Sequence, residues 1–385
     1  MSQLPVVPPQ HEPLGIAAAL ALREGRLTSA ALAERLPGQD HAALRSALLA
    51  DGWLQPADGD THRMAPRRAH LFGADIGGTK IHAAIAGLDG EILVEIEQPT
   101  TQDGGAALVE QLHDICTALA SEAGVPPTAI AAGALGIPGS FNPKTRRPFL
   151  VPNITGFEGF PIVEAFEQRM GFPVRIDNDA NMAAQGEMWR GEGRNVGCFV
   201  FIAIGTGIGM GIINDGRVLA GSRGAAGEIA TLPIGGDPFD TRNFHAGAFE
   251  TSIGSLALAD RYAALGGTPG LSVRQIVDAL ADGDVAAEAT IAEMTRQLAI
   301  AIAAITAVLD PERIVLGGSI GARAEVLERL RACLPLCMFD PPDCVVSTLG
   351  RRAGLIGTIS RSHELLADML AGGDPTRIGR SLHRT

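Results

Sequence analysis

The hexapeptide DIGGTK, which begins at Asp75, combines the residue types that a phosphate-binding turn needs. Apolar runs stand on both sides of it, so it is predicted to join two strands. Gly77 and Gly78 permit positive φ and lack the Cβ atoms that would keep a ligand away from the backbone. Converging N–H groups would then meet an anion, with a hydroxyl from Thr79 and a positive charge from Lys80. Asp75 is placed to hold Mg²⁺ through water or to orient an attacking group. An ordinary Gly-Gly hairpin remains the alternative for the glycine pair alone.

A second glycine turn has the same setting. The apolar strand predicted at 198–204 leads into Gly205, Thr206 and Gly207, and a further strand follows at 211–213. Strand, glycine turn and strand therefore occur twice in the chain. This repetition predicts a duplicated architecture in which a phosphate is clamped between the two copies.

The elements that must position these turns alternate between strands and helices, which predicts an α/β fold from residue 69 onward. Before the second turn we expect a meander at 71–98, strands at 130–137 and 174–176, and helices at 106–123, 162–170 and 182–190. After it we expect a strand at 313–316 and helices at 284–308, 322–331 and 353–370.

The chain in front of this α/β region has a different pattern. Residues 1–13 are rich in proline and are predicted to be disordered. Residues 14–68 predict three short helices and a small β wing, which is the pattern of a winged helix-turn-helix. Between residues 12 and 68, however, seven arginines are balanced by seven acidic residues, whereas DNA-binding surfaces carry a positive excess. DNA binding and a structural or dimerising role both stay open for this module.

Charge and cysteine content restrict the partners and the compartment. The chain carries 31 basic and 43 acidic side chains, a net charge of −12, which argues against broad contact with nucleic acid or anionic lipid. No apolar run reaches the ~18 residues of a membrane-spanning helix, and no secretory signal is visible. Five scattered cysteines favour reduced thiols and therefore a cytoplasmic protein. Cys333, Cys337 and Cys344 are interpreted as small buried hydrophobic residues, with a metal site as the alternative.

Four motifs in order carry a family resemblance. They are DIGGTK from Asp75, NDAN from Asn178, GTGIG from Gly205 and AGEI from Ala226. Over about residues 71–370 the chain resembles the ROK family, which contains bacterial sugar kinases and sugar-responsive repressors. The resemblance implies the actin-like, hexokinase-type fold, with two RNase H-like lobes and a nucleotide and sugar cleft. A winged-helix module in front is the layout of the repressor branch.

This resemblance also sets the expected domain limits. We expect the winged helix-turn-helix-like module at 1–68, the first lobe at 69–192 together with 358–371, the second lobe at 193–357, and a mobile tail at 372–385.

The resemblance assigns roles residue by residue. Nucleotide and phosphate binding falls to Asp75, Gly77, Gly78, Thr79, Lys80, Gly205, Thr206, Gly207, Gly317 and Gly318. Substrate binding falls to Gly139, Asn153, Asn178, Asp179, Glu228, Thr231 and Glu250. Asp179 matches the catalytic base of the family, and phosphoryl transfer to a hydroxyl requires a carboxylate that accepts the proton. Read without the flanking motifs, Asp-Asn-Asp after a strand is equally good turn and N-cap chemistry.

One part of the family pattern is missing. Most members carry a histidine and a cysteine-rich zinc knuckle after the Gly-Glu pair. Here Thr231 stands at the histidine position, and Thr241, Asn243 and Ala248 replace the cysteines. Zinc requires soft or imidazole donors in a tetrahedral array, and only His245 remains nearby. We therefore expect no zinc, and the loss leaves kinase activity open to question.

Three functions remain in consideration. The favoured one is an ATP-dependent sugar kinase that uses ATP and Mg²⁺, with Asp179 as general base, because a pure sensor would tolerate loss of the glycine loop that is intact here. The second is a sugar-responsive transcriptional regulator that contacts DNA through residues 14–68. The third is a degenerate sugar-binding protein. In each case we expect a homodimer that does not contact a membrane.

Overall fold

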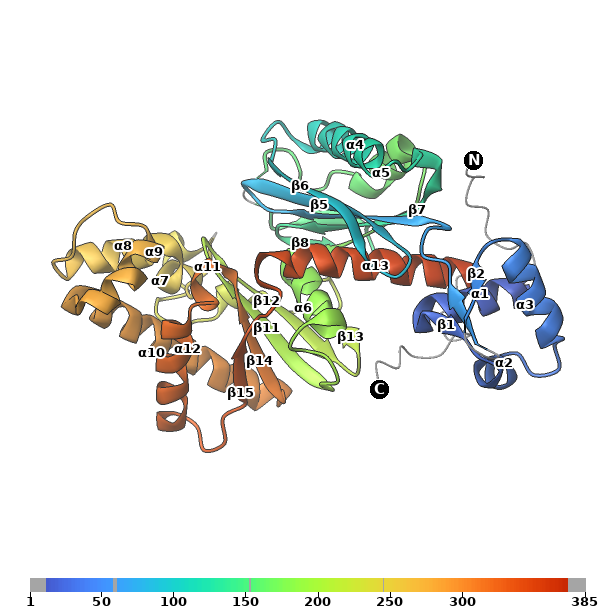
Figure 1. The fold of residues 1–385 in the computed structure, drawn as a ribbon. Coiled ribbons are helices and arrows are strands. Elements are labelled where there is room, and N and C mark those ends of the chain that lie inside the picture. Colours follow the sequence, from blue (N-terminus) through green and yellow to red (C-terminus); the bar gives the residue numbers. More distant parts are fainter. Residues whose placement is uncertain (1–11, 58–60, 152–153, 245, 373–385) are drawn as a thin grey trace. The chain divides into compact units, whose positions relative to one another are not determined.

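The computed structural model describes residues 12–57, 61–151, 154–244 and 246–372, and its chain forms an α/β fold (Figure 1). Two compact units make up the chain: Met1–Met182 with Leu355–Thr385, and Ala183–Gly354. The first unit therefore includes the N-terminal region and the last helix. The sequence predicted lobe limits at 192/193 and 357/358. The chain instead passes from one unit to the other inside α6 (Asp179–Arg190) and near the start of α13 (Ala353–Leu370).

The N-terminal region contains three helices and a small antiparallel sheet. The helices are α1 (Glu12–Glu24), α2 (Ser29–Arg35) and α3 (His41–Ala50), and the strands are β1 (Arg26–Leu27), β2 (Leu54–Pro56) and β3 (His62–Met64), in the order β1-β3-β2. Side-chain caps begin two of the helices, since Thr28 accepts a hydrogen bond from the first turn of α2 and Asp40 does so for α3. Trp53 is 1% exposed and anchors the region.

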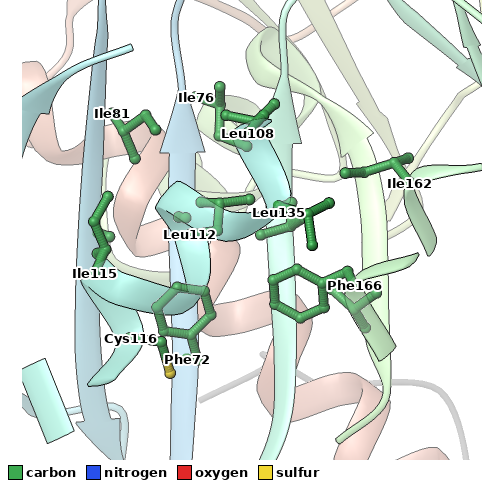
Figure 2. Packing of buried hydrophobic residues seen from close by; sticks show 14 of the residues in the cluster. Phe72, Ile76, Ile81, Leu108, Leu112, Ile115, Cys116, Leu135, Ile162 and Phe166 are labelled. Atoms are coloured by element: carbon green, nitrogen blue, oxygen red, sulfur yellow. The ribbon is translucent and has the colours of Figure 1, made fainter. Parts of the chain in front are cut away.

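A five-stranded sheet in the order β10-β7-β4-β5-β6 forms the centre of the first unit. Its strands are β4 (His70–Ile76), β5 (Lys80–Gly87), β6 (Ile92–Pro99), β7 (Ile130–Ile137) and β10 (Val174–Asn178). A short hairpin, β8 (Ser140–Asn142) and β9 (Arg147–Phe149), follows β7. On one face, α4 (Gly105–Glu122) and α5 (Ile162–Met170) bury an apolar core against the strands, in which Phe72, Leu112 and Phe166 meet (Figure 2).

The other face of this sheet receives part of α13 (Ala353–Leu370). The Ser362 hydroxyl donates a hydrogen bond to the Phe72 carbonyl at 2.7 Å. A Cβ on Gly73 would lie 2.5 Å from the Thr358 hydroxyl oxygen and 2.8 Å from an Ile359 methyl carbon, so glycine is required for this close approach.

The second unit has its own five-stranded sheet in the order β13-β12-β11-β14-β15. Its strands are β11 (Cys198–Ile204), β12 (Ile208–Asn214), β13 (Arg217–Val218), β14 (Arg313–Gly317) and β15 (Asp343–Val346). Its helices are α7 (Glu250–Ile253), α8 (Ser255–Ala264), α9 (Val273–Asp278), α10 (Val285–Leu309), α11 (Gly318–Gly321) and α12 (Ala324–Cys333). By length and composition α10 could cross a membrane, but half of its most apolar window is buried in the unit, where Ile291, Leu298 and Ile302 belong to the core.

The two sheets share one topology, which confirms the duplication predicted from the glycine turns. In each sheet two parallel pairings lead to a central hairpin, β4–β5 in one and β11–β12 in the other, and an antiparallel edge strand follows. In each unit the outermost parallel strand leads to a helix shared by both units: β10 to α6 (Asp179–Arg190) and β15 to α13. The units thus exchange helices.

Candidate active site

The first glycine turn lies at the tip of the β4–β5 hairpin. The Gly77 N–H donates to the Lys80 carbonyl at 2.8 Å and closes the turn. Neither Gly77 nor Gly78 has positive φ, so the expectation that the pair would use left-handed backbone is wrong. The turn closes with ordinary backbone angles. The pair contributes its missing side chains, because a Cβ on Gly77 would lie only 3.2 Å from the Lys80 carbonyl oxygen.

Two side chains from the segment after β6 fix the peptide planes of this turn. The Thr100 hydroxyl donates to the Gly77 carbonyl at 2.8 Å, and the Gln102 amide donates to the Gly78 carbonyl at 3.0 Å. In a trans peptide the C=O and the N–H point in opposite directions. The N–H groups that follow these carbonyls, those of Gly78 and Thr79, therefore point away from the bracing side chains. They form the donor pair that an anion would meet.

The second glycine turn, between β11 and β12, is braced in the same way. The Gly205 N–H donates to the Gly207 carbonyl at 2.9 Å. Ser255, at the start of α8, donates its hydroxyl to the Gly205 carbonyl at 2.7 Å and its N–H to the Thr206 carbonyl at 3.3 Å. The N–H groups of Thr206 and Gly207 then point away from Ser255. The duplicated fold therefore repeats its donor pair as well as its strands.

Two carboxylates lie together beside the first turn. Asp75, at the end of β4, is half-buried, and desolvation by burial raises its pKa to about 7. The charge of Asp179 raises this pKa further, and the ammonium of Lys80 opposes the rise. Lys80 is exposed and donates to Glu97 at 3.0 Å across the β5–β6 ladder. The first unit thus holds a pair of like charges that a cation would stabilise.

Asp179 is the first residue of α6, and its neighbour performs the capping. The Asn178 Oδ1 accepts from the N–H groups of Ala180 at 2.8 Å and Asn181 at 3.1 Å. Its amide nitrogen donates to the Gly139 carbonyl at 2.7 Å, so both ends of the Asn178 side chain have protein partners. Asn178 therefore carries the N-cap chemistry predicted as the alternative for this segment. The Asp179 Oδ1 accepts from the adjacent Ala180 N–H at 2.7 Å.

A second pair of carboxylates lies beside the second turn. The Glu250 Oε2 accepts from the Ile208 N–H at 3.0 Å, and a Cβ on Gly207 would collide with this carboxylate. Burial raises the pKa of Glu250, the Ile208 hydrogen bond lowers it, and the charge of Glu228 raises it. The Thr231 hydroxyl donates back to the Glu228 carbonyl at 2.9 Å. Three substrate-binding candidates of the second unit thus gather at its glycine turn.

The glycine pair after β14 packs against the same β11 strand end. Gly318 has a φ of +80°, and a Cβ there would lie 2.3 Å from the Ile204 carbonyl oxygen. A Cβ on Gly317 would lie 2.4 Å from the Phe201 ring. The Ser319 hydroxyl, one residue on, is 3.4 Å from the Cβ position of Gly205. Gly317 and Gly318 therefore allow α11 to begin next to the second turn.

Hydrogen bonds connect residues 237–251, the segment in which the sequence predicts no zinc knuckle. The Thr251 hydroxyl donates to the Asn243 Oδ1 at 2.7 Å, and the Asn243 amide donates to the Asp237 carbonyl at 2.8 Å. Asn243, at one of the replaced cysteine positions, thus links the two ends of this loop. Within the described residues no group of three or more His, Cys, Asp or Glu side chains is arranged to hold a metal ion, and His245 is outside them.

The predicted site residues thus form one cluster in each unit. The first holds Asp75, Gly77, Gly78, Thr79, Lys80, Gly139, Asn178 and Asp179; the second holds Gly205, Thr206, Gly207, Glu228, Thr231, Glu250, Gly317 and Gly318. Asn153 lies outside the described residues. Sequence reasoning missed Thr100, Gln102 and Ser255, which brace the turns. Only Ser255 left a signal, since Gly-Ser before an apolar run indicates a helix start.

Known proteins match both the sequence and the fold. The model of the ROK family matches residues 71–364. A glucokinase from Halalkalibacterium halodurans is 32% identical over 308 residues, 74% of this chain and 92% of that protein. A xylose repressor from Caldicellulosiruptor bescii is 26% identical over 320 residues, 78% of this chain and 79% of that protein.

One solved structure matches beyond the α/β region. It is a ROK family transcriptional regulator, a homologue of the E. coli MLC protein, and the match covers 96% of this chain and 99% of that one at a TM-score of 0.80 and 21% identity. At this identity the likeness concerns the fold alone. Its coverage nevertheless extends over the N-terminal helices and strands described above.

Proposed function

The chain belongs to the ROK family, and from this premise we propose that it is an ATP-dependent sugar kinase in which Asp179 accepts the proton of the attacking sugar hydroxyl. The observation that supports this proposal most strongly is the repeated donor pair. Each unit keeps a glycine turn whose carbonyls are held by side chains or by a helix start, which leaves the N–H groups directed toward a ligand. A protein that only senses sugar has no need of this device.

In the proposed reaction each residue has a separate task. The N–H groups of Gly78, Thr79, Thr206 and Gly207 bind phosphate oxygens, and preorganised donors of this kind stabilise the charge that develops on the transferred group. Asp179 lies in the first turn of α6, at the positive end of the helix dipole. The ionised carboxylate orients the sugar hydroxyl and takes its proton as the oxygen attacks. Glu228 and Glu250 accept hydrogen bonds from other sugar hydroxyls.

Mg²⁺ fits the residues of the first turn. Asp75 and Asp179 supply oxygen donors, which Mg²⁺ prefers. The pKa of Asp75 is raised first by burial and then by the charge of Asp179, and a divalent cation would oppose both effects. Asp75 is the residue proposed to hold the ion, through water or directly. When bound, Mg²⁺ neutralises phosphate charge. Asp179 keeps the role of base.

The test is an ADP-release assay with a panel of hexoses, amino sugars and ketoses, run on the wild type and two matched variants. Asp179→Asn preserves shape but cannot accept the proton, so turnover should fall by about 10²- to 10⁴-fold while sugar binding changes little. Asp114→Asn makes the same change on the exposed surface of α4 and should leave turnover unaltered. Retention of more than about a tenth of the turnover by Asp179→Asn would refute the base assignment.

A second candidate function, a sugar-responsive regulator, is favoured by the N-terminal region. The fold match to a transcriptional regulator covers this region, and the xylose repressor is 26% identical to the chain. Because the basic and acidic side chains of residues 12–68 balance, nonspecific affinity for DNA should be low. If the wild type binds a sugar from the panel, transfers no phosphate, and releases a specific duplex when that sugar is added, this second function replaces the first.

A further inference from the structure

A line of buried and half-buried charges runs along α13 through the first unit. We call it the α13 ion network, and it comprises Arg23, Arg175, Asp177, Asn181, Arg361, Glu364 and Asp368. All of its members belong to the same compact unit. Three arginines and three carboxylates balance within it, and none of these charged side chains is more than 29% exposed.

One end of the network holds residues 177–181, the junction of β10 and α6 that contains Asp179, which we call the 177–181 segment. Asp177 stands two residues before Asp179, at the end of β10. The Asn181 amide donates to the Asp177 Oδ1 at 2.8 Å, and an Arg361 Nη2 lies 3.7 Å from the Asp177 Oδ2. Both carboxylate oxygens of Asp177 are thus engaged, one by the first turn of α6 and one by α13. Arg361 is therefore a positioning residue for the 177–181 segment, because it contacts Asp177, two residues before Asp179.

The middle of the network follows one face of α13. Residues 361, 364 and 368 recur at the i, i+3, i+7 spacing of a helix face. The Arg361 Nη1 donates to Glu364 at 2.7 Å. Arg175, from β10, lies 3.9 Å from Glu364 and donates to Asp368 at 3.1 Å. These contacts connect neighbouring turns of the helix through the strand beneath it.

The other end of the network reaches the N-terminal region. Arg23, in the last turn of α1, has its Nη2 3.7 Å from the Asp368 Oδ1, and the two side chains are 17% and 18% exposed. This contact is as long as the one between Arg361 and Asp177 at the opposite end. The Asp368 Oδ1 and the Arg361 Nε are buried and make no hydrogen bond within the described part of the chain. The Asp368 Oδ1 can therefore accept a hydrogen bond when Arg23 moves closer.

We propose that the α13 ion network couples the order of the 177–181 segment to the stability of helix α1. An interaction that fixes one end holds α13 charges in the geometry that the other end needs, and such coupling is reciprocal by thermodynamic necessity. The part of this inference that concerns sugar rests on the proposed function: a sugar that orders the 177–181 segment would also stabilise helix α1. The coupling itself requires neither sugar nor ATP.

Amide hydrogen exchange of the full chain, without ligand, tests the coupling in both directions. Asp177→Asn removes the charge at the end of the network that lies in the 177–181 segment. Exchange in residues 12–24 should then become at least about fivefold faster. Arg23→Gln removes the charge at the α1 end, and exchange in residues 177–181 should become faster by a similar factor. Glu110→Gln breaks an exposed ion pair with Arg169 outside the network and should leave both segments unchanged.

Asp368→Asn provides a second route if Asp177→Asn does not fold, because it cuts the network between Arg175 and Arg23 and should affect both segments together. If either variant makes exchange faster only in the segment that carries the substitution, the coupling is overturned. An equal response to Glu110→Gln would also overturn it, because the effect would then be general destabilisation. Since no activity is measured, the coupling can fail while the kinase proposal stands, and the reverse is equally possible.

Discussion

Replacement of Asp75 by asparagine should remove a pH-dependent part of the stability of the first unit. The pKa of Asp75 is about 7 in the folded protein, against 3.8 for the ordinary carboxyl. A folded-state pKa above the unfolded one stabilises the protein at low pH, and this contribution is lost as the pH rises through the folded value. The slope approaches about 1.4 kcal/mol per pH unit well below the folded pKa and flattens near it, so the loss between pH 5 and pH 7 is about 2.3 kcal/mol in total.

Urea unfolding at pH 5 and pH 8 in the presence of EDTA measures this effect. Trp53 is 1% exposed and belongs to the same unit as Asp75, so its fluorescence reports unfolding there when Trp189 is replaced by Phe in both proteins. From pH 5 to pH 8 the wild type should lose about 2.5 kcal/mol more than Asp75→Asn. Other titrating groups are shared by the two proteins and cancel in the difference.

Two additions to this experiment separate its causes. Asp179→Asn removes a charge that raises the pKa of Asp75, so the loss of stability should be complete at a lower pH. Mg²⁺ in place of EDTA should stabilise the wild type at pH 8 and have little effect on Asp75→Asn. A difference between wild type and Asp75→Asn that is the same at both pH values would refute the reasoning, because Asp75 would then ionise as an ordinary carboxyl.

Two further substitutions test the loops of the second unit. Gly318→Ala should destabilise the protein by at least about 2 kcal/mol, because the new Cβ combines positive φ with a position 2.3 Å from the Ile204 oxygen. Gly283→Ala, at a φ of +74° with open space around it, keeps the strain without the clash, so a loss in thermal melts as large as that of Gly318→Ala would contradict this account. Asn243→Ala should lower stability by about 1–2 kcal/mol, because it removes the two side-chain hydrogen bonds that join Asn243 to Asp237 and Thr251. The purified protein should contain less than one zinc per chain by elemental analysis. Tightly held stoichiometric zinc would contradict the prediction that the zinc knuckle is lost.

Local patterns were sufficient to predict the duplicated strands and the glycine turns, because apolar runs and glycine pairs determine these within a few residues. The short helices α7, α8 and α9 were not predicted, since each offers at most three turns of periodicity. The braces were also missed, because Thr100 and Ser255 act on glycines that only the fold brings near them.

The charge contacts on α13 show the same limit more strongly. Asp177 and Arg361 are separated in sequence by the whole of the second unit, and no local spacing relates them. The predicted lobe limits at 192/193 and 357/358 followed the ends of sequence patterns. The compact units divide instead at 182/183 and 354/355, because packing rather than helix continuity determines which unit a turn of α6 or α13 joins.

The exchanged helices have a consequence for synthesis on the ribosome. The first sheet is translated early, but the α13 residues that cover one of its faces, including Ser362, come after the entire second unit. At ~5–20 residues per second, translation of residues 183–370 takes about 10–40 s. During that time the face around Gly73 and Phe72 lacks its partner helix. The first unit therefore completes its fold only after the second unit has been synthesised, and neither unit can be produced as an independent fragment by a single cut.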